Sequence, residues 1–368
     1  MRTSSTSVAA AGGVPPPVSP HPCASEHQSV KEMSELEVCE IPPEDYTRWD
    51  DVVKESVEGT VFHLSDWVTT VGGLTGRKTT ILGVYRQDDL LGGCALYVRL
   101  FPVLSLATTD ASMTPFGGIC SLPSESVKGK KQLLHRHSIM GALRDHLAAH
   151  FDAVHLTNSP GLVDIRPFTW DGWKSNVLFT NYLVLKDAVA DTTSRTVRNA
   201  LKRAAKNGIS AEKKIDSGAY NVLFRRTFQR QDLAPLVPEK FLNGMISLIG
   251  SRKLGEMWCA KTPSGEIAAS TIVVWDSRHA HAWSAAADPE LRETEAHTYL
   301  FTEICKDLQS RGFKGFNLQT GNTPRLTAFY ASYNPVLTPY YQVAKIAPRA
   351  RAAYAAKNTI DTFIGRRW

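Results

Sequence analysis

Residues 287–324 read ADPELRETEAHTYLFTEICKDLQSRGFKGFNLQTGNTP, the clearest local pattern in the chain. Apolar side chains recur at helical spacing over Glu295–Gln309, and Gly312 predicts the end of that helix. The residues that follow predict a strand over Phe313–Thr320 and a short helix over Arg325–Tyr333. Strands that alternate with a helix of this length indicate an α/β domain.

Working outward, the same order of elements occurs twice. Before the helix, the pattern predicts strands over Gly255–Ala260, Ile267–Trp275 and Ala280–Ala286. In the first half, the pattern predicts two strands, Thr79–Tyr85 and Leu90–Leu100, followed by a helix over Lys130–His150. Two more strands are predicted there, over Asp152–Thr157 and Val177–Lys186. The last strand of the second half is predicted over Val336–Ile346. The two hairpins align at a constant offset of 176 residues. We interpret the repeat as an internal duplication.

A length of 368 residues favours two domains. We expect a disordered N-terminal tail over 1–33, because its prolines prevent regular structure. An N-terminal domain is predicted over 34–188, a C-terminal domain over 189–346, and a basic helix or tail over 347–368.

The composition is that of a globular protein, with 43% hydrophobic and 21% charged residues. It excludes a wholly disordered, collagen-like or coiled-coil chain. No apolar run approaches the roughly 18 residues of a membrane helix, so no membrane span is expected. The six cysteines lie far apart without a C-x-x-C pair, which indicates reduced thiols and a cytoplasmic location.

The net charge of +6 is concentrated in two places, a helix region near residue 200 and the C-terminal segment. Ser194–Gly208 predicts a helix with a serine cap and a glycine stop. Arg195, Arg198, Lys202 and Lys206 recur at spacings of 3, 4 and 4, so they form one stripe on it. The stripe is either a solvated face or a site for the phosphates of a nucleotide-linked substrate, a coenzyme or tRNA.

Residues 316–324 predict a strand that runs into a Gly/Asn/Pro loop before the last helix. Ligands commonly bind at such strand ends, although an ordinary connecting loop has the same composition.

Other motifs give little support for a site. Residues 73–79 do not have phosphate-loop spacing, and no G-x-S-x-G occurs. His146 and His150 could share a helix face, but no further ligand completes a metal site, so we expect no metal. His279 and His281 would share a strand face, where packing is favoured over catalysis.

Seven short motifs occur in a fixed order: Phe62–Trp67, Pro115–Gly118, Arg198–Gly208, Gly265–Ala269, Ala287–Arg292, Arg311–Asn317 and Pro324–Phe329. In this order they resemble the FemAB-like branch of the GNAT acyltransferase superfamily, including the BioF2-like acetyltransferases, over about residues 40–346. The resemblance implies an α/β fold of two tandem GNAT-like domains, with mixed, largely antiparallel sheets flanked by helices.

The resemblance also implies an enzyme that moves an acyl or aminoacyl group from a thioester or a charged tRNA onto an amine. Its site would lie in the C-terminal domain, where neighbouring strands splay. The implied catalytic residues are Tyr330 and Asn317. The implied substrate-binding residues are Gln319, Asn322 and Arg325 in the strand-end site, with Arg198, Asn199, Lys202 and Lys206 near the phosphates.

Three positions depart from the family pattern. The stretch Leu291–Ala296 lacks the glycines of a coenzyme A loop, and its glutamates would repel a pyrophosphate. Asn317 stands where the family strand often ends in an acid, and Tyr330 stands where FemAB-like proteins often carry lysine. An amide cannot act as a base, and tyrosine supplies no fixed positive charge.

Three hypotheses follow. The first is an N-acyltransferase that uses an acyl-CoA-type thioester and a small-molecule or nucleotide-linked amine acceptor. The second is aminoacyl transfer from charged tRNA, favoured by the basic stripe and the missing glycines. The third is a non-catalytic binding protein on the same fold, because fold alone does not establish activity.

Overall fold

The computed structural model describes residues 36–351, apart from 103, 125, 127, 186–193, 230–232, 320 and 323. The predicted tail 1–33 and most of the predicted segment 347–368 lie outside the described residues. Each helix in the described part of the chain is too short or too polar to cross a membrane.

The first half contributes seven strands and four α-helices to the described structure. The strands are β1 (Glu37–Glu40), β2 (Lys78–Arg86), β3 (Asp89–Phe101), β4 (Leu104–Thr108), β5 (Gly118–Ser121), β6 (Ala153–Thr157) and β7 (Lys174–Val184). The helices are α2 (Tyr46–Glu55), α3 (Ser65–Thr75), α4 (Gly129–His150) and α5 (Arg166–Thr169).

The second half begins with α7 and ends on a long strand. In chain order its elements are α7 (Arg195–Lys206), β8 (Ser210–Lys213), α8 (Ser217–Gln229), α9 (Glu239–Ser251), β9 (Gly255–Lys261), β10 (Ile267–Trp275), β11 (His279–Ala287), α10 (Ala296–Ser310), β12 (Gly315–Asn317), α11 (Pro324–Ala331) and β13 (Val336–Ile346). The predicted strands over 267–275 and 336–346 have these same bounds. The predicted strand over 313–320 is shorter, because only residues 315–317 pair with neighbours.

The described strands form one sheet in the order β1-β2-β3-β4-β6-β13-β7-β12-β11-β10-β9-β8, with β5 paired to β3. Within it, β4–β6 and β11–β12 are the parallel pairs among the described residues. The two halves repeat one pattern: four antiparallel strands, a helix, then a parallel strand. This shared topology agrees with an internal duplication, and the α/β class with a mixed, largely antiparallel sheet is confirmed.

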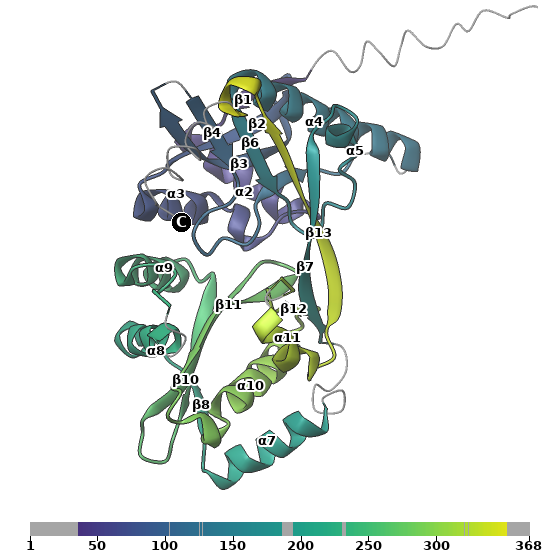
Figure 1. The fold of residues 1–368 in the computed structure, drawn as a ribbon. Coiled ribbons are helices and arrows are strands. Elements are labelled where there is room, and N and C mark those ends of the chain that lie inside the picture. The colour runs from purple at the N-terminus through teal and green to yellow at the C-terminus, as the bar shows by residue number, and fades with distance from the viewer. Residues whose placement is uncertain are drawn as a thin grey trace, which may run out of the picture. The chain divides into compact units, whose positions relative to one another are not determined.

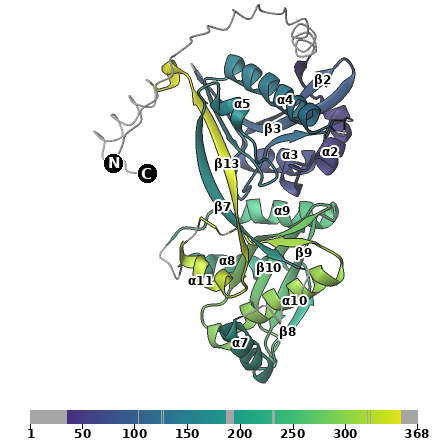
Figure 2. The ribbon, with the colours of Figure 1, turned by 90° about the vertical axis from the view of Figure 1, so that its right-hand side faces the viewer.

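The halves exchange their last strands. β7 leaves the first half and pairs with β12, whereas β13 leaves the second half and pairs with β6. β7 and β13 also pair with each other, from Val336 opposite Tyr182 to Ala344 opposite Lys174. Figure 2 shows the two strands side by side between the helices of the halves. The exchanged strands therefore join the sheets of the two halves into one continuous sheet.

Helices cover both faces of the sheet. On one face, α2 and α3 of the first half and α8 and α9 of the second share a single apolar core. Trp67 and Trp283 meet in this core with ring centroids 5.6 Å apart. On the other face, α4 and α5 cover the first half, whereas α7, α10 and α11 cover the second. Figure 1 shows α8 and α9 on one side of β10 and β11, with α10 on the other.

Candidate functional site

The sheet opens where β11 and β12 separate. The two strands pair in parallel from His279 opposite Gly315 to His281 opposite Asn317. β11 then continues to Ala287 along β10, while β12 ends at Asn317. Carboxyl ends of neighbouring parallel strands that diverge leave a crevice where ligands commonly bind. The separation therefore defines the candidate site.

The corresponding point in the first half is closed. β4 and β6 also pair over a short stretch, which ends at Thr108 opposite His155. Beyond it, Gly117 forms a bridge with Asn158 and donates its N–H to the carbonyl of Thr157 over 3.0 Å. Because this segment fills the gap, the duplicated fold keeps an open separation in the second half only, as far as the described residues extend.

A β-bulge lies beside the open separation. Ile272 faces Ser284 and Val273 faces Ala282, so Trp283 stands outside the ladder of β10 and β11. The indole N–H of Trp283 donates to the carbonyl of Met113 over 2.7 Å. Bulges of this kind re-aim a strand, and they occur often beside active sites.

A cavity of about 470 Å³ opens on the α10 face of the site. Its lining comes from β10, β11, the loop before α10, α10 itself and α11, and it consists of Ala268, Ala287, Asp288, Pro289, Leu291, Arg292, Glu293, Glu295, Ala296, His297, Thr298 and Phe329. Arg226 pairs with Asp288, and Arg203 of α7 pairs with Glu295. The two ion pairs offset part of the acidic charge at the start of α10, the charge that the sequence predicted.

Three side chains form a row across β7, β12 and β11 on the opposite face. Tyr182 faces Asn317 in the antiparallel pair, and His281 faces Asn317 in the parallel pair. We call Tyr182, Asn317 and His281 the polar row. Asn317 is fully buried, and its Oδ1 accepts from Thr180 Oγ1 over 2.6 Å and from the Gln319 N–H over 2.9 Å. The Nδ2 of Asn317 has no hydrogen-bond partner within 3.5 Å, but it lies close enough to the Tyr182 hydroxyl to oppose the rise that burial causes in the pKa of that phenol.

His281 is held by a carboxylate. Its Nε2 lies 3.0 Å from Oδ2 of Asp276, while its Nδ1 is buried without a partner. Burial opposes the charge of Asp276, but hydrogen bonds from His281 and from the backbone N–H groups of His279 and Arg278 hold the pKa of the carboxyl below its ordinary value. The imidazole also packs edge-on against Phe62, at a centroid distance of 5.1 Å.

Tyr330 lies on the cavity side of the sheet, away from the side chain of Asn317. It packs against Phe301 of α10 and against Phe329, which lines the cavity. Burial raises the pKa of Tyr330 to about 12, so its hydroxyl keeps its proton at neutral pH. Phe329 also stacks on His297, whose pKa burial lowers to about 4.

The other residues expected in the strand-end site are partly gathered. Gln319 has a φ of 54° and bonds to Asn317 through its backbone, while its Nε2 is buried without a partner. Asn322 bridges the exchanged strands: its Oδ1 accepts from the Phe179 N–H over 2.9 Å, and its Nδ2 lies 3.0 Å from the hydroxyl of Tyr340. Arg325 lies on α11, within Pro324–Ala331.

The basic stripe lies on α7, as predicted, with Ser194 as its N-cap and Gly208 beyond its end. Four substrate-binding candidates are exposed on this helix: Arg198, Asn199, Lys202 and Lys206. The last turns of α7 reach the start of α10, where Arg203 meets Glu295 and Asn207 donates to the carbonyl of Glu293 over 3.3 Å. The stripe therefore flanks the cavity rather than the polar row.

Sequence reasoning missed the pairing of Asp276 with His281, which it treated as packing. The only local signal was an acid placed five residues before the histidine, across a turn. The orphaned Nδ1 depends on packing by Phe62 and Phe116 from the first half, far away in sequence.

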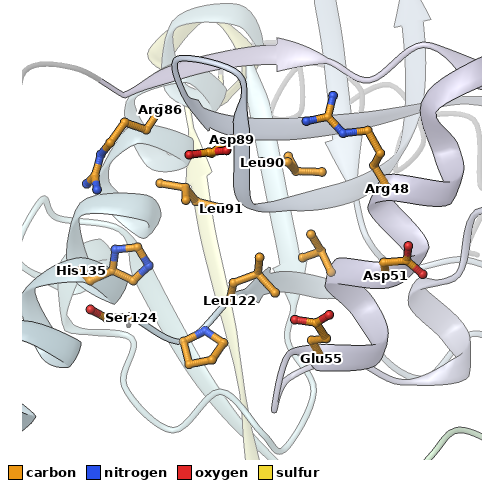
Figure 3. A pocket seen from close by; sticks show the side chains of 12 residues that line it. Arg48, Asp51, Glu55, Arg86, Asp89, Leu90, Leu91, Leu122, Ser124 and His135 are labelled. Atoms are coloured by element: carbon orange, nitrogen blue, oxygen red, sulfur yellow. The ribbon is translucent and has the colours of Figure 1, made fainter. Parts of the chain in front are cut away.

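Two further cavities lie in or beside the first half. One of about 620 Å³ has Asp51 and Glu55 of α2 across from His135 of α4, with Arg48 and Arg86 at its rim (Figure 3). Charges of both signs ring it, so it shows no preference for an anion. The other, of about 270 Å³, is lined by Val57, Gly59, Thr60, Ser159, Pro160, Gly161, Tyr182, Arg278, His279 and Thr338.

No group of three or more potential metal ligands gathers within the described residues. His146 and His150 stack with centroids 4.0 Å apart, and the Nδ1 of His150 lies 2.8 Å from the carbonyl of His146. This contact satisfies a carbonyl near the end of α4.

Comparison with known proteins gives a family match in the second half. Residues 192–327, from α7 into α11, match the family described as the acetyltransferase (GNAT) domain. This range includes the strand separation and all of the cavity lining except Phe329. No curated protein matches the chain.

Solved structures with similar folds cover most of the chain. FemX has a TM-score of 0.64 at 13% identity, covering 83% of this chain and 96% of its own. A Bacteroides thetaiotaomicron protein of unknown function has a TM-score of 0.55 at 10% identity, covering 84% and 100%. The C-terminal domain of a putative lysylphosphatidylglycerol synthetase from Agrobacterium fabrum has a TM-score of 0.52 at 12% identity, covering 86% and 96%. At these identities the likeness concerns the fold.

Proposed function

We propose, from the premise that residues 192–327 belong to the GNAT acetyltransferase family, that this chain is an N-acyltransferase. The GNAT part of the predicted resemblance is confirmed by the family match, which supports an acyltransferase, and the fold likeness to FemX is consistent with the FemAB-like branch. Our proposal goes further: the donor is an acyl-CoA-type thioester, and the acceptor is a small-molecule or nucleotide-linked amine. The reaction belongs in the cytoplasm, where such donors are made.

The observation that carries the proposal is the two-sided separation of β11 and β12. A cavity lies on the α10 face, and the polar row lies on the opposite face. Acyl transfer needs two reactants to meet at one carbonyl carbon, and holding them in place supplies much of the rate. A gap in the sheet lets the donor approach from the α10 face and the amine from the other.

The cavity suits the uncharged arm that joins the phosphates of a donor to its acyl end, because His281 lies six residues back along β11 from Ala287 in the cavity lining, about 20 Å away. Ala268, Ala287 and Ala296 give it small apolar walls, and the Arg203–Glu295 ion pair offsets only part of the acidic charge at the start of α10. The phosphates would then contact α7, where Arg198, Asn199, Lys202 and Lys206 are exposed. Tyr330 remains the candidate proton donor: its hydroxyl keeps its proton at neutral pH, and its ring packs against Phe329, which lines the cavity.

A second candidate donor is aminoacyl-tRNA, favoured by the length of the basic stripe. The exposed cations run from Arg195 to Lys206, the whole of α7, which exceeds the needs of one pyrophosphate. A polyanion would contact all of them, and its binding would weaken steeply with salt.

The test is release of free thiol from a panel of acyl-CoA thioesters, with a panel of primary amines, measured with a thiol reagent. We expect release that needs both the thioester and an amine. A matched arm supplies charged tRNA with and without ribonuclease, and follows the loss of the aminoacyl ester. Amine-dependent turnover that vanishes with ribonuclease would assign the tRNA donor, and no turnover with either donor would refute the enzyme.

A further inference from the structure

Buried polar atoms without partners gather at the separation of β11 and β12. The Nδ1 of His281, the Nδ2 of Asn317 and the Nε2 of Gln319 are buried and make no hydrogen bond. Both His281 and Asn317 are fully buried, and they face each other across the parallel pair. Leaving such groups unpaired costs about 1–3 kcal/mol each, so their retention points to a ligand that pairs with them.

The orphaned atoms have complementary chemistry. Because the Nε2 of His281 faces the carboxylate of Asp276, that nitrogen carries the proton, and Nδ1 presents a lone pair. Asn317 uses its Oδ1 to accept two hydrogen bonds, so the group left over is its N–H donor, whose near neighbour is the Tyr182 hydroxyl. A free acceptor beside a free donor matches an amine that loses a proton while a carbonyl oxygen gains charge.

The polar row reaches a cavity of its own. Tyr182, at one end of the row, lines the cavity of about 270 Å³, as do His279 and Arg278. Arg278 donates to the carbonyl of Gly59 over 2.6 Å, which ties the cavity wall to the first half. This cavity lies on the face opposite α10, since His279 and His281 share a strand face. It therefore offers the second reactant its own approach.

We propose that the polar row is the acceptor side of the transfer site, in which His281, oriented by Asp276, removes the proton from the attacking amine and Asn317 stabilises the oxyanion. The inference rests on the proposed function. His281 and Asn317 are the catalytic residues, and Asp276 is a positioning residue. The substrate class is a neutral primary amine that arrives past Tyr182.

The step balances without a further reactant. The amine nitrogen attacks the acyl carbon, a C–N bond forms, and the carbonyl electron pair moves to oxygen, where Asn317 donates. The nitrogen gives one proton to Nδ1 of His281. Collapse re-forms the carbonyl and breaks the C–S bond of a thioester, or the C–O bond of an aminoacyl ester. The leaving group carries the electron pair, and the proton on His281 passes to solvent.

The step predicts a rate that rises with pH, because His281 must accept the proton of the amine through its free Nδ1. The titratable and charged groups near it are Asp276 and Arg278 from the β10–β11 turn, His279 from β11, Tyr182 from β7, Tyr340 from β13, and His63 from the first half. Of these, Asp276 contacts the imidazole directly, with 3.0 Å between its Oδ2 and the Nε2 of His281.

The first test compares His281→Gln with wild type, using a donor and amine pair that the thiol-release panel turns over. Loss of a general base typically costs 10²–10⁴-fold, so we expect kcat to fall at least about 100-fold and the rising limb of the pH profile to disappear. Asp276→Asn should lower kcat about 10-fold. The matched control is His137→Gln, which removes another histidine bonded to an aspartate, Asp164, at 2.7 Å in the first half. A fall of less than about threefold in folded His281→Gln would overturn the proposal.

A second test needs neither turnover nor a variant that folds. The ¹⁵N shifts of the His281 ring, in labelled wild type, report which nitrogen carries the proton. We expect the proton on Nε2, and a shift of Nδ1 when glycinamide is added as the probe amine. A proton on Nδ1, or no response of Nδ1 to glycinamide, would overturn the inference. Absence of thiol release with every pair would instead refute the proposed function.

Discussion

At the scale of single residues, His63 is, like His297, a buried histidine whose protonation opposes folding. Its Nε2 donates to the carbonyl of Gly117 over 2.6 Å, and its Nδ1 accepts from the N–H of Thr60 over 3.1 Å. Burial lowers the pKa of His63 to about 4, against 6.5 in the unfolded chain. Protonation would therefore place a charge in the core and break the capping contact with Thr60.

The lowered pKa of His63 predicts that acid destabilises the protein over a defined pH range. The unfolded chain binds the proton below about pH 6.5, whereas the folded chain does so only near pH 4, so stability falls as pH drops between them. We expect His63 to remove about 2 kcal/mol between pH 7.5 and pH 5, measured by urea unfolding. Glutamine can keep the capping box but does not titrate. The His63→Gln variant should therefore lose about 2 kcal/mol less stability than wild type over this pH range.

The control for this prediction is His155→Gln. The hydrogen bond that His155 donates to the carboxylate of Asp110 raises the pKa of His155, so this pair stabilises the fold at low pH and its contribution is lost as pH rises. Because His155→Gln removes this stabilising pair, the stability of that variant should fall more steeply on acidification than that of wild type. An unchanged pH dependence in His63→Gln would contradict the account.

Residues of the candidate site differ in how far the sequence could reveal them. Asn317 and Gln319 lie at the end of a strand and in the loop after it, and the sequence predicts that arrangement from local residues alone. The partner of Asn317 is Thr180, on a strand more than a hundred residues earlier, and local spacing cannot specify that contact. For the same reason the sequence could not place Tyr330 and Asn317 on opposite faces of the sheet.

At the scale of elements, α7 is the part of the site that the sequence described best. Its cap, its stop and its cationic stripe are all local patterns, and each is present in the structure. The helices α8 and α9 were not predicted, because their apolar residues pack into a core shared with the first half. Helix α3 packs against α9, and the two helices belong to different halves, so neither segment alone can predict the contact.

We predict that α7 binds the phosphates of the donor. The triple variant Arg198→Ala, Lys202→Ala, Lys206→Ala should raise the KM for the donor at least about 10-fold with kcat nearly unchanged, because it removes binding that does not change in the transition state. With a tRNA donor, the salt dependence should also become shallower. Steady-state kinetics at two salt concentrations checks both.

The matched control removes two exposed cations from α4, with Lys130→Ala and Lys131→Ala. These substitutions also reduce the total positive charge, but far along the chain from the cavity lining. If the control raised KM as much as the triple variant, the effect would be one of net charge, and the assignment of α7 would be wrong.

At the scale of the whole molecule, the exchange of β7 and β13 makes the two halves one sheet. Each half contributes its last strand to the other, and the two exchanged strands pair with each other. The sequence predicted both strands, and the bounds of β13, but not their partners. A strand's period of two fixes its faces, whereas its neighbours depend on the whole topology.

The arrangement of the whole sheet also explains why the candidate site lies in only one of the two similar halves. The separation beyond β4 and β6 is bridged by Gly117 and Asn158, whereas the separation beyond β11 and β12 has a cavity on one face and buried, unpaired polar atoms on the other. The central claim is that a donor in that cavity reacts through the gap with an amine on the far face.

The most direct test is the formation of N-acylated amine, measured by mass spectrometry, by wild type and by Ala287→Phe, which fills the cavity. The control is Ala211→Phe. Ala211 lies on β8 and packs against the same apolar core, but it does not line the cavity. We predict product from wild type and the control, and at least about a tenfold loss in Ala287→Phe. Equal product from all three, or none from wild type with any donor, would contradict the claim.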